Sequence, residues 1–423
     1  MDRSGACALG LYISIPFCRS KCTYCNFASG VYPAADHARY VERVAADLAG
    51  ARARAARLGA ELPARVDTVY LGGGTPSLLG PELVARLFAV LRAEFALDAG
   101  AEMTMECAPG QLSEPTLAAM AEAGVNRVSL GAQSFVTSEA RASGRLHTGA
   151  AIEEDLRRLR AAGITNLNVD LIAGLAGQTP ASWEESLDAL VASEVPHASV
   201  YMLEVDEDSR LGRELLAGGA RYRAGLVPDE DAIVRMYERA IERLEAAGLA
   251  QYEISNFSRA GQASRHNLRY WRRQPYLGVG LDASSLLRAA DGGAGEGDSP
   301  APVLRMTTTA DLAAYLDGTG ALEAEWLGPA RQHEEAWFLG LRTNVGVERT
   351  ALEAEFGDAL VAPAMETVRW LAADGLLAFD GVRAHLTARG RLLSNEVFQE
   401  FVAHRAKGDS NGSPARARIQ ASS

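Results

Sequence analysis

Short apolar segments alternate with longer segments of helical spacing over the first two-thirds of the chain, and this alternation constrains the fold most. We expect six strands, at Leu11–Ile15, Val66–Leu71, Glu102–Glu106, Asn126–Leu130, Asn166–Ile172 and Ala198–Leu203. Between them apolar residues recur at helical intervals, as at Val41, Val44 and Leu48. Strand–helix alternation predicts a parallel sheet with right-handed crossovers. Six such units favour an α/β fold built as a partial barrel, and a doubly wound sheet is the alternative.

Changes in pattern along the chain predict four parts. Residues 1–250 carry the β/α units, and residues 251–330 form a connecting region with a Gly-rich loop at 289–301. Residues 331–402 show helices and then a hairpin at Asp380-Gly381, which is typical of a winged helix. Thr387 is expected to cap a last helix that runs through Phe401. Residues 403–423 are polar, and we expect a disordered tail there.

The charge balance and the hydropathy limit the partners of the chain. The 423 residues include 42 basic and 54 acidic side chains, and the net charge of −12 argues against general nucleic-acid binding. No segment approaches the roughly 18 uninterrupted apolar residues of a membrane span. The apolar stretch at residues 8–17 lacks the basic start and the cleavage site of a signal peptide. We therefore expect a cytoplasmic protein without stable membrane insertion.

Three of the five cysteines lie close together directly after the first expected strand. Cys18, Cys22 and Cys25 have the spacing Cys-x3-Cys-x2-Cys, whereas a disulfide framework would spread its cysteines along the chain. Three thiolates on one short loop suit three corners of a cubane iron–sulfur cluster and leave one iron open to an outside ligand. A zinc site whose fourth ligand is a distant histidine is the alternative.

Glycines and polar side chains follow the expected strands at their carboxyl ends, where parallel β/α folds place their sites. The segment Gly72-Gly73-Gly74-Thr75-Pro76 lets backbone groups approach a ligand closely. The polar side chains at the ends of four later strands are Glu106, Gln133, Asp170 and Glu204. Such groups cost desolvation unless they are partnered. Their repetition predicts a polar pocket for a ligand with amino, carboxylate and ribose groups.

These motifs resemble those of the radical S-adenosylmethionine superfamily. Within it, the chain resembles the branch that contains oxygen-independent coproporphyrinogen III oxidases and HemW-type heme chaperones. The branch features are Tyr12–Cys18, Gly131–Phe135, Gly144–His147, Asp170–Leu175 and Tyr252–Phe257, and the resemblance extends from about Leu11 to Phe401. It implies a partial (β/α)6 barrel with a [4Fe-4S] cluster on Cys18, Cys22 and Cys25. It also implies an electron donor for the cluster, and S-adenosylmethionine bound to the open iron.

The resemblance further implies which residues surround S-adenosylmethionine. They are Tyr12, Tyr24, Gly73, Gly74, Thr75, Glu106, Gln133, Arg145 and Asp170, and Glu204 is added from the strand-end pattern. Glu106 and Arg145 would face the amino-acid end of the cofactor, and Asp170 and Gln133 its ribose hydroxyls. In the superfamily, the reduced cluster cleaves the cofactor to a deoxyadenosyl radical, so the cofactors carry the hard step. No catalytic residue of this chain follows from the sequence.

Two features separate the members of this branch. The oxidases carry a further cysteine where this chain has Phe27, and a longer extension before the cluster loop. The chaperones resemble this chain in the segment His266–Trp271, which the resemblance links to heme through His266, Tyr270 and Trp271. Imidazole can ligate iron, and aromatic rings can pack on a porphyrin.

We therefore expect a chaperone that binds heme and transfers it to an acceptor protein. One alternative is radical oxidative decarboxylation of coproporphyrinogen III propionates, and another is a zinc-stabilised binding protein. Whether the chain is an enzyme stays open at this point.

Two positions depart from the pattern of the branch. The family usually has Ala-His after the segment Tyr276–Gly280, whereas this chain continues Leu281-Asp282-Ala283-Ser284, so the role of Ser284 is open. Cys107 stands where the family more often has Asn or Ala. We interpret Cys107 as a buried thiol without a function in the site.

Overall fold

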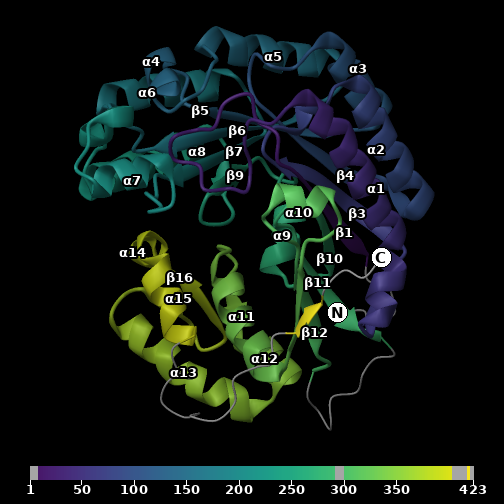
Figure 1. Ribbon diagram of the computed structural model, residues 1–423. Helices are drawn as coiled ribbons and strands as arrows, with labels where there is room; N and C mark the ends of the chain where they lie inside the picture. Colours follow the sequence, from purple (N-terminus) through teal and green to yellow (C-terminus); the bar gives the residue numbers. More distant parts are fainter. Residues whose placement is uncertain (1–7, 291–299, 403–416, 420–423) are drawn as a thin grey trace.

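The computed structural model describes residues 8–290, 300–402 and 417–419, and a parallel sheet forms its centre (Figure 1). The central strands lie in the order β10-β1-β3-β4-β5-β6-β7. Their bounds are β1 (Leu9–Ile15), β3 (Arg65–Gly73), β4 (Ala96–Cys107), β5 (Arg127–Gln133), β6 (Asn166–Ala173), β7 (His197–Met202) and β10 (Tyr276–Gly280). From β1 to β7 the neighbours follow chain order without the reversal that defines a doubly wound sheet. The expected partial barrel is confirmed, and the doubly wound alternative does not hold.

Helices cover the outer face of this sheet (Figure 1). They are α1 (Ala34–Arg57), α2 (Pro81–Glu94), α3 (Glu114–Glu122), α5 (Gly149–Ala161), α6 (Pro180–Ala192) and α8 (Glu230–Ala246). The short helices α4 (Thr137–Ala142) and α7 (Arg210–Leu216) instead contact the cysteine loop at Thr23, and η1 (Pro76–Leu79) and η2 (Arg221–Leu226) are short turns. Tyr40, Val41 and Val44 of α1 are fully buried and join the core with alternate residues of the strands. The other face of each strand is turned inward, so polar side chains of several strands can meet there.

Residues 251–330, which we expected to be a connecting region, extend the sheet with antiparallel strands. These are β9 (Asn256–Ser258), β11 (Ser284–Ala289), β12 (Val303–Thr307) and β13 (Leu322–Leu327), together with β2 (Ala60–Glu61), β8 (Ala250–Gln251) and β17 (Ala417–Ile419). Helices α9 (Arg265–Trp271) and α10 (Leu312–Leu316) lie between them in sequence. Of the expected Gly-rich loop, residues 291–299 lie outside the described residues.

The C-terminal segment forms a second core of its own, with Trp337, Val368 and Leu386 among its buried residues. It consists of α11 (Pro329–Leu341), β14 (Val347–Glu348), α12 (Arg349–Phe356), α13 (Asp358–Ala373), β15 (Leu377–Phe379), β16 (Arg383–Leu386), α14 (Ala388–Leu392) and α15 (Ser394–Val402). The hairpin is present as expected, and Thr387 accepts a hydrogen bond from the N–H of Gly390. The single last helix that we expected is instead two helices, because Leu393 leaves the helical conformation.

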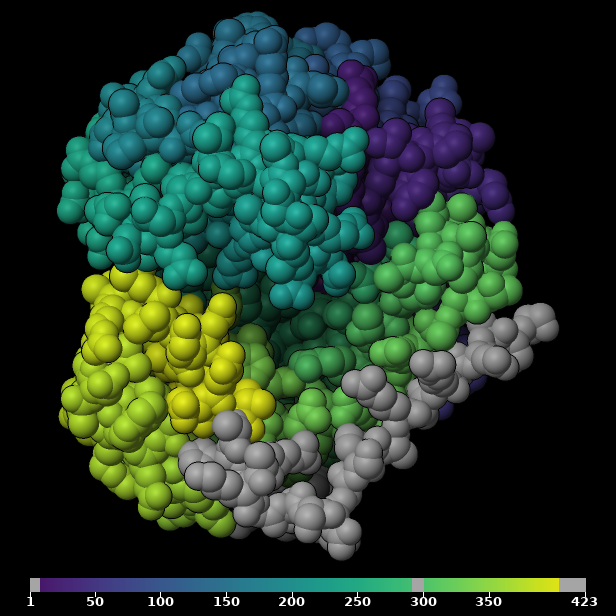
Figure 2. All heavy atoms as spheres, turned by 60° about the vertical axis from the view of Figure 1, so that its left-hand side comes forward, coloured from purple at the N-terminus to yellow at the C-terminus, as the bar shows by residue number. Residues whose placement is uncertain are grey.

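In the space-filling view this segment (yellow) lies below the segment around residue 200 (teal), and residues from the middle of the chain are visible in the recess between them (Figure 2). Apart from residues 417–419, the expected tail at 403–423 lies outside the described residues. The division of the chain at residues 250, 330 and 402 stays a prediction. None of the helices in the described part of the chain is both long and apolar enough to span a membrane.

Candidate functional site

The loop that carries the three cysteines begins where β1 ends and is fixed at several points. The N–H of Cys18 donates to the carbonyl of Gly30 (2.8 Å), and the N–H of Thr23 donates to the carbonyl of Ser143 (3.0 Å). The Nζ of Lys21 donates across the loop to the carbonyls of Phe27 (2.6 Å) and Ser29 (2.8 Å). The loop therefore has a defined shape with its cysteines in fixed places.

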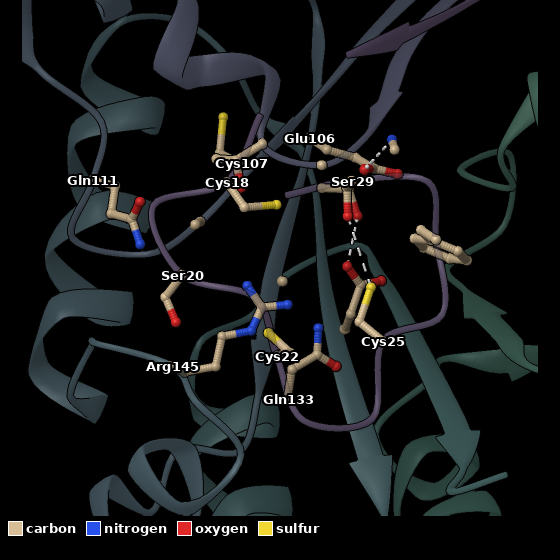
Figure 3. A pocket seen from close by; sticks show the side chains of 18 of the residues that line it. Cys18, Ser20, Cys22, Cys25, Ser29, Glu106, Cys107, Gln111, Gln133 and Arg145 are labelled. Atoms are coloured by element: carbon tan, nitrogen blue, oxygen red, sulfur yellow. Dashed lines mark hydrogen bonds between the residues drawn. The ribbon is translucent and has the colours of Figure 1, made fainter. Parts of the chain in front are cut away.

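All three cysteines line one pocket of about 320 Å³, at the small end of the usual range for ligand sites. Figure 3 shows Cys18, Cys22 and Cys25 around this space together with Glu106, Gln133 and Arg145. Burial raises the pKa of the Cys18 thiol, and the neighbouring thiols of Cys22 and Cys25 raise it further. Thiolates that line one pocket repel one another, and a bound cation relieves that repulsion. The donor set thus fits a cationic, thiophilic group such as an iron–sulfur cluster.

The Gly-rich turn after β3 is hydrogen-bonded to the backbone at the start of the cysteine loop. Gly73 has a φ of +103°, and the N–H groups of Gly74 and Thr75 donate to the carbonyls of Ile15 (2.8 Å) and Phe17 (2.7 Å). A Cβ on Gly74 would lie 2.7 Å from the carbonyl oxygen of Phe17, so no larger residue fits there without displacement. The glycines therefore serve the close contact between two strand ends, and Gly73, Gly74 and Thr75 also line the pocket.

Glu106 lies at the carboxyl end of β4 and points into the pocket. Its Oε1 accepts a hydrogen bond from the hydroxyl of Tyr70 (2.8 Å), and its Oε2 accepts one from the N–H of Gly73 (3.1 Å). Burial raises the pKa of Glu106 to about 7, and the negative field of Asp170 adds to the effect. This carboxyl group can therefore change its charge near neutral pH in response to a bound cation.

Gln133 and Arg145 come into the pocket from the end of β5 and from the loop after α4. Gln133 has a φ of +67° next to a register shift in the β5–β6 pairing, which turns its side chain inward at the strand end. An Nη of Arg145 donates to the hydroxyl of Tyr24 at 3.4 Å, a long hydrogen bond. Its Nε is buried without a partner among the described residues. Arg145 can therefore still bind an acceptor on a ligand.

Asp170 of β6 belongs to a polar cluster inside the barrel. Its two oxygens accept hydrogen bonds from the Ser129 hydroxyl (3.0 Å) and from the Asn168 amide (2.8 Å). The same Asn168 amide donates to Ser129 (2.7 Å) and to Ser199 (3.0 Å). Burial raises the pKa of Asp170, and these donors act in the opposite direction. The carboxylate is thus held in one orientation.

The structure does not bring all the expected residues into the pocket. Tyr12 is not among the lining residues, and the centre of its ring lies 6.2 Å from that of Tyr70, which does line the pocket. Glu204 is exposed just after β7 and does not line the pocket either, whereas Tyr201 of the same strand does.

Lining residues that the sequence analysis missed are Gln111, Arg127, Ser129, Asn168, Ser199, Tyr201 and Asn267. Three of them, Arg127, Ser129 and Asn168, lie at even spacing before a strand-end residue that we did expect, which is Gln133 or Asp170. This period of two is the signal that could have found them.

The expected heme segment lies on α9, which packs against β3. The Nδ1 of His266 pairs with the hydroxyl of Thr68 (2.9 Å), and its Nε2 pairs with the hydroxyl of Tyr270 (2.8 Å). Burial lowers the pKa of His266 to about 3, so the imidazole is neutral at physiological pH. The indole of Trp271 lies under the guanidinium of Arg342, at 4.4 Å from the ring centre. Neither ring nitrogen of His266 is free in this conformation.

The structure also shows the surroundings of Phe27, Ser284 and Cys107, where the sequence differs from the pattern of the branch or of the oxidases. Phe27, which stands where the oxidases have a cysteine, is 62% exposed and lines the pocket. Ser284 is exposed on β11, within 3.2 Å of the Thr307 hydroxyl. Cys107 is buried, and burial raises the pKa of its thiol to about 12.

Comparison with known proteins gives two family matches. Residues 12–190 match the radical SAM superfamily, and residues 327–393 match the HemN C-terminal domain. The chain is 31% identical to the heme chaperone HemW of Lactococcus lactis subsp. lactis over 92% of this chain and 96% of the relative. It is 33% identical to that of Mycobacterium tuberculosis, over 93% and 94%.

One solved structure matches almost the whole fold. It is coproporphyrinogen III oxidase (HemN) from Escherichia coli, a radical SAM enzyme, with a TM-score of 0.77 over 94% of this chain and 91% of that chain. At 23% sequence identity this likeness concerns the fold alone.

Proposed function

The chain belongs to the HemW-type branch of the radical S-adenosylmethionine superfamily, and on that premise we propose that it is a heme chaperone. It binds heme and passes it to an acceptor protein. The observation that carries the proposal is the 31–33% identity to heme chaperones over nearly the full length of both chains. Phe27 supports it, because the resemblance associates a cysteine at this place with the oxidases.

Cys18, Cys22 and Cys25 would hold a [4Fe-4S] cluster. When bound, the cluster supplies an open iron and one electron to S-adenosylmethionine. Support comes from the shared pocket of the three thiols and from their mutual repulsion without a cation. The hydrogen bonds of the loop fix its backbone, whereas the described residues include no ready-made metal-binding group, so the three thiols would still have to converge on the cluster.

Charged groups of opposite sign would orient the amino-acid end of S-adenosylmethionine. Arg145 offers an unpartnered Nε for the carboxylate, and Glu106, with its pKa near 7, gains negative charge when an ammonium or sulfonium group approaches. Asp170 would accept hydrogen bonds from the ribose hydroxyls, since Ser129 and Asn168 already fix its orientation. Gln133 would bind the same ribose hydroxyls as Asp170.

Heme would bind at α9, through His266, Tyr270 and Trp271. His266 can ligate iron only after it gives up its bonds to Thr68 and Tyr270, so ligation by this residue requires a local movement of α9. The indole of Trp271 and the ring of Tyr270 would pack on the porphyrin plane.

A heme titration of the full chain, followed by its Soret absorbance, tests this proposal. We expect saturable binding that weakens in Trp271→Ala. The control is Trp370→Ala, because Trp370 is a half-exposed tryptophan on α13, outside the heme segment. Absence of saturable binding would contradict the proposal.

Two further assays address the alternatives. Robust conversion of coproporphyrinogen III under reducing, oxygen-free conditions would favour the oxidase. Zinc without iron or sulfide after anaerobic reconstitution would exclude both leading functions and favour a zinc-stabilised binding protein.

A further inference from the structure

A buried arginine lies at the inner end of the pocket and has no role in the site described above. Arg127 is the first residue of β5, opposite Thr104 of β4 and Asn166 of β6, and it lines the pocket. Arg127 is only 2% exposed. Within the described ranges of the chain, its Nε has no hydrogen-bond partner and its guanidinium forms no ion pair. A buried guanidinium that forms no salt bridge and has an unsatisfied Nε is unfavourable, and an anion in the pocket would relieve this.

The alternation of β5 aims Arg127 into the barrel. Ser129, Gly131 and Gln133 follow at even spacing and line the same pocket, whereas the residues between them pack into the hydrophobic core. Arg127 is therefore on the face that carries the expected cofactor site. Six residues of extended chain separate it from Gln133, which is roughly 20 Å along the strand. This distance sets Arg127 apart from the amino-acid end of S-adenosylmethionine near the cysteine loop.

The nearby carboxyl groups form no ion pair with Arg127 in the described part of the chain, although the positive field of Arg127 acts on Asp170 and opposes the rise in its pKa that burial causes. Asp170 accepts hydrogen bonds from Ser129 and Asn168, and Glu106 accepts from Tyr70 and Gly73.

The strand neighbours of Arg127 are also incompletely bonded. In the described part of the structure, the Thr104 hydroxyl and the side-chain amide oxygen (Oδ1) of Asn166 are buried without partners. Three adjacent residues of one row across β4, β5 and β6 thus have unsatisfied polar atoms. Such a row indicates a ligand or water that the polypeptide itself does not supply.

We propose that Arg127 binds the carboxylate of a second ligand, which lies deeper in the pocket than S-adenosylmethionine. One guanidinium matches a single negative charge, and two parallel N–H donors match the two oxygens of a carboxylate. The buried acids Glu106 and Asp170 disfavour a dianion such as phosphate at this end. Asn267 lines the same pocket and offers a neutral hydrogen-bonding group to the rest of the ligand. The inference goes beyond the proposed function, which assigns no second ligand to this pocket, and it does not depend on heme binding.

Carboxyl-labelled propionate, observed by NMR on the full chain with its cluster assembled, tests the proposal. We expect saturable binding of propionate both with and without S-adenosylhomocysteine, and no binding of the neutral isostere propionamide. Arg127→Gln should weaken propionate binding roughly tenfold or more, because a charge-assisted hydrogen-bond pair is lost. Arg127→Lys keeps the charge and should retain part of the affinity. Arg141→Gln, at an exposed arginine on α4, should leave it unchanged.

Several results would overturn the proposal. If propionate and S-adenosylhomocysteine displace each other, the carboxylate site belongs to the cofactor and no second ligand is needed. Equal binding of propionate by Arg127→Gln and the unmodified chain would show that water alone solvates Arg127. Equal binding of propionate and propionamide would show that the charge is not recognised. The last comparison and the displacement experiment use the unmodified chain, so they decide the matter even if Arg127→Gln does not fold.

Discussion

Replacing Gly74 by alanine would press a methyl group against the backbone that carries the cysteine loop. The added Cβ would lie 2.7 Å from the carbonyl oxygen of Phe17 and 2.8 Å from that of Ile15, where ordinary contact begins at 3.4 Å. Both obstacles are backbone atoms, which cannot rotate away as a flexible side chain can. The ends of β1 and β3 must therefore move apart by several tenths of an ångström.

The same two carbonyls accept the hydrogen bonds that hold the strand ends together. Gly74 donates to Ile15 and Thr75 donates to Phe17. Each backbone hydrogen bond contributes about 0.5–1.5 kcal/mol net, so loosening both should lower the free energy of unfolding by about 1–3 kcal/mol. Cluster content after reconstitution should fall as well, because these contacts position the loop that carries Cys18.

Urea unfolding of the cluster-free protein measures the first effect, and iron and sulfide analysis measures the second. Gly50→Ala is the matched control, because a Cβ at Gly50 in the middle of α1 meets nothing within 4 Å. Alanine there should raise the free energy of unfolding by about 0.5–1 kcal/mol, since it favours the helix. If Gly74→Ala unfolds like the unmodified chain and takes up a full cluster, the close contact does not have the role that we assign to it.

Three other outcomes follow from buried acids and thiols. Burial raises the pKa of Glu106 from 4.5 to about 7, so between these two pH values the folded state keeps a proton that the unfolded state releases. The free energy of unfolding should therefore fall as the pH rises from about 4.5 to about 7. Urea titrations at several pH values should find a weaker fall in Glu106→Gln. If the free energy of unfolding depends on pH equally in the variant and the unmodified chain, the raised pKa of Glu106 is contradicted. The pKa of Cys107 near 12 predicts iodoacetamide labelling on the order of a hundredfold slower than in the urea-unfolded chain, followed by mass spectrometry, and fast labelling would argue against its burial. Glu102 accepts hydrogen bonds from the N–H groups at the start of α9, including that of His266, so Glu102→Ala should cost about 1–3 kcal/mol in urea unfolding. The exposed Glu61→Ala should change stability by less than about 0.5 kcal/mol, and equal effects would refute the capping role.

The strand-end residues of the pocket could be predicted from the sequence because apolar strands and following glycines or acids are local signals. Glu106, Gln133 and Asp170 all line the pocket as expected. Glu204 does not, because the chain has left the strand before it and the side chain is exposed. A strand-end pattern gives the position of a polar residue but not the direction in which the chain turns.

The inner part of the pocket was not predictable by the same reasoning. Arg127 lies at the amino end of its strand, where a charged residue ordinarily marks the boundary with solvent. Only the pairing of β5 with β4 and β6 places it inside the barrel. The strands of residues 251–330 were missed for a related reason. Their antiparallel pairing is non-local, and runs as short as Ser284–Ala289 carry little periodicity.

The place of β1 between β3 and β10 has a consequence for how the protein is made. The cysteine loop directly follows β1, yet one of the two strands that flank β1 is Tyr276–Gly280, which is translated long after that loop. Contacts between segments so far apart form late, because closing the long intervening loop costs entropy. Until then β1 lacks one of its two strand neighbours, and we expect the loop that follows it to be held less firmly. If the cysteines hold the proposed cluster, we expect them to take up iron and sulfide in their final arrangement only after β10 has been translated and paired.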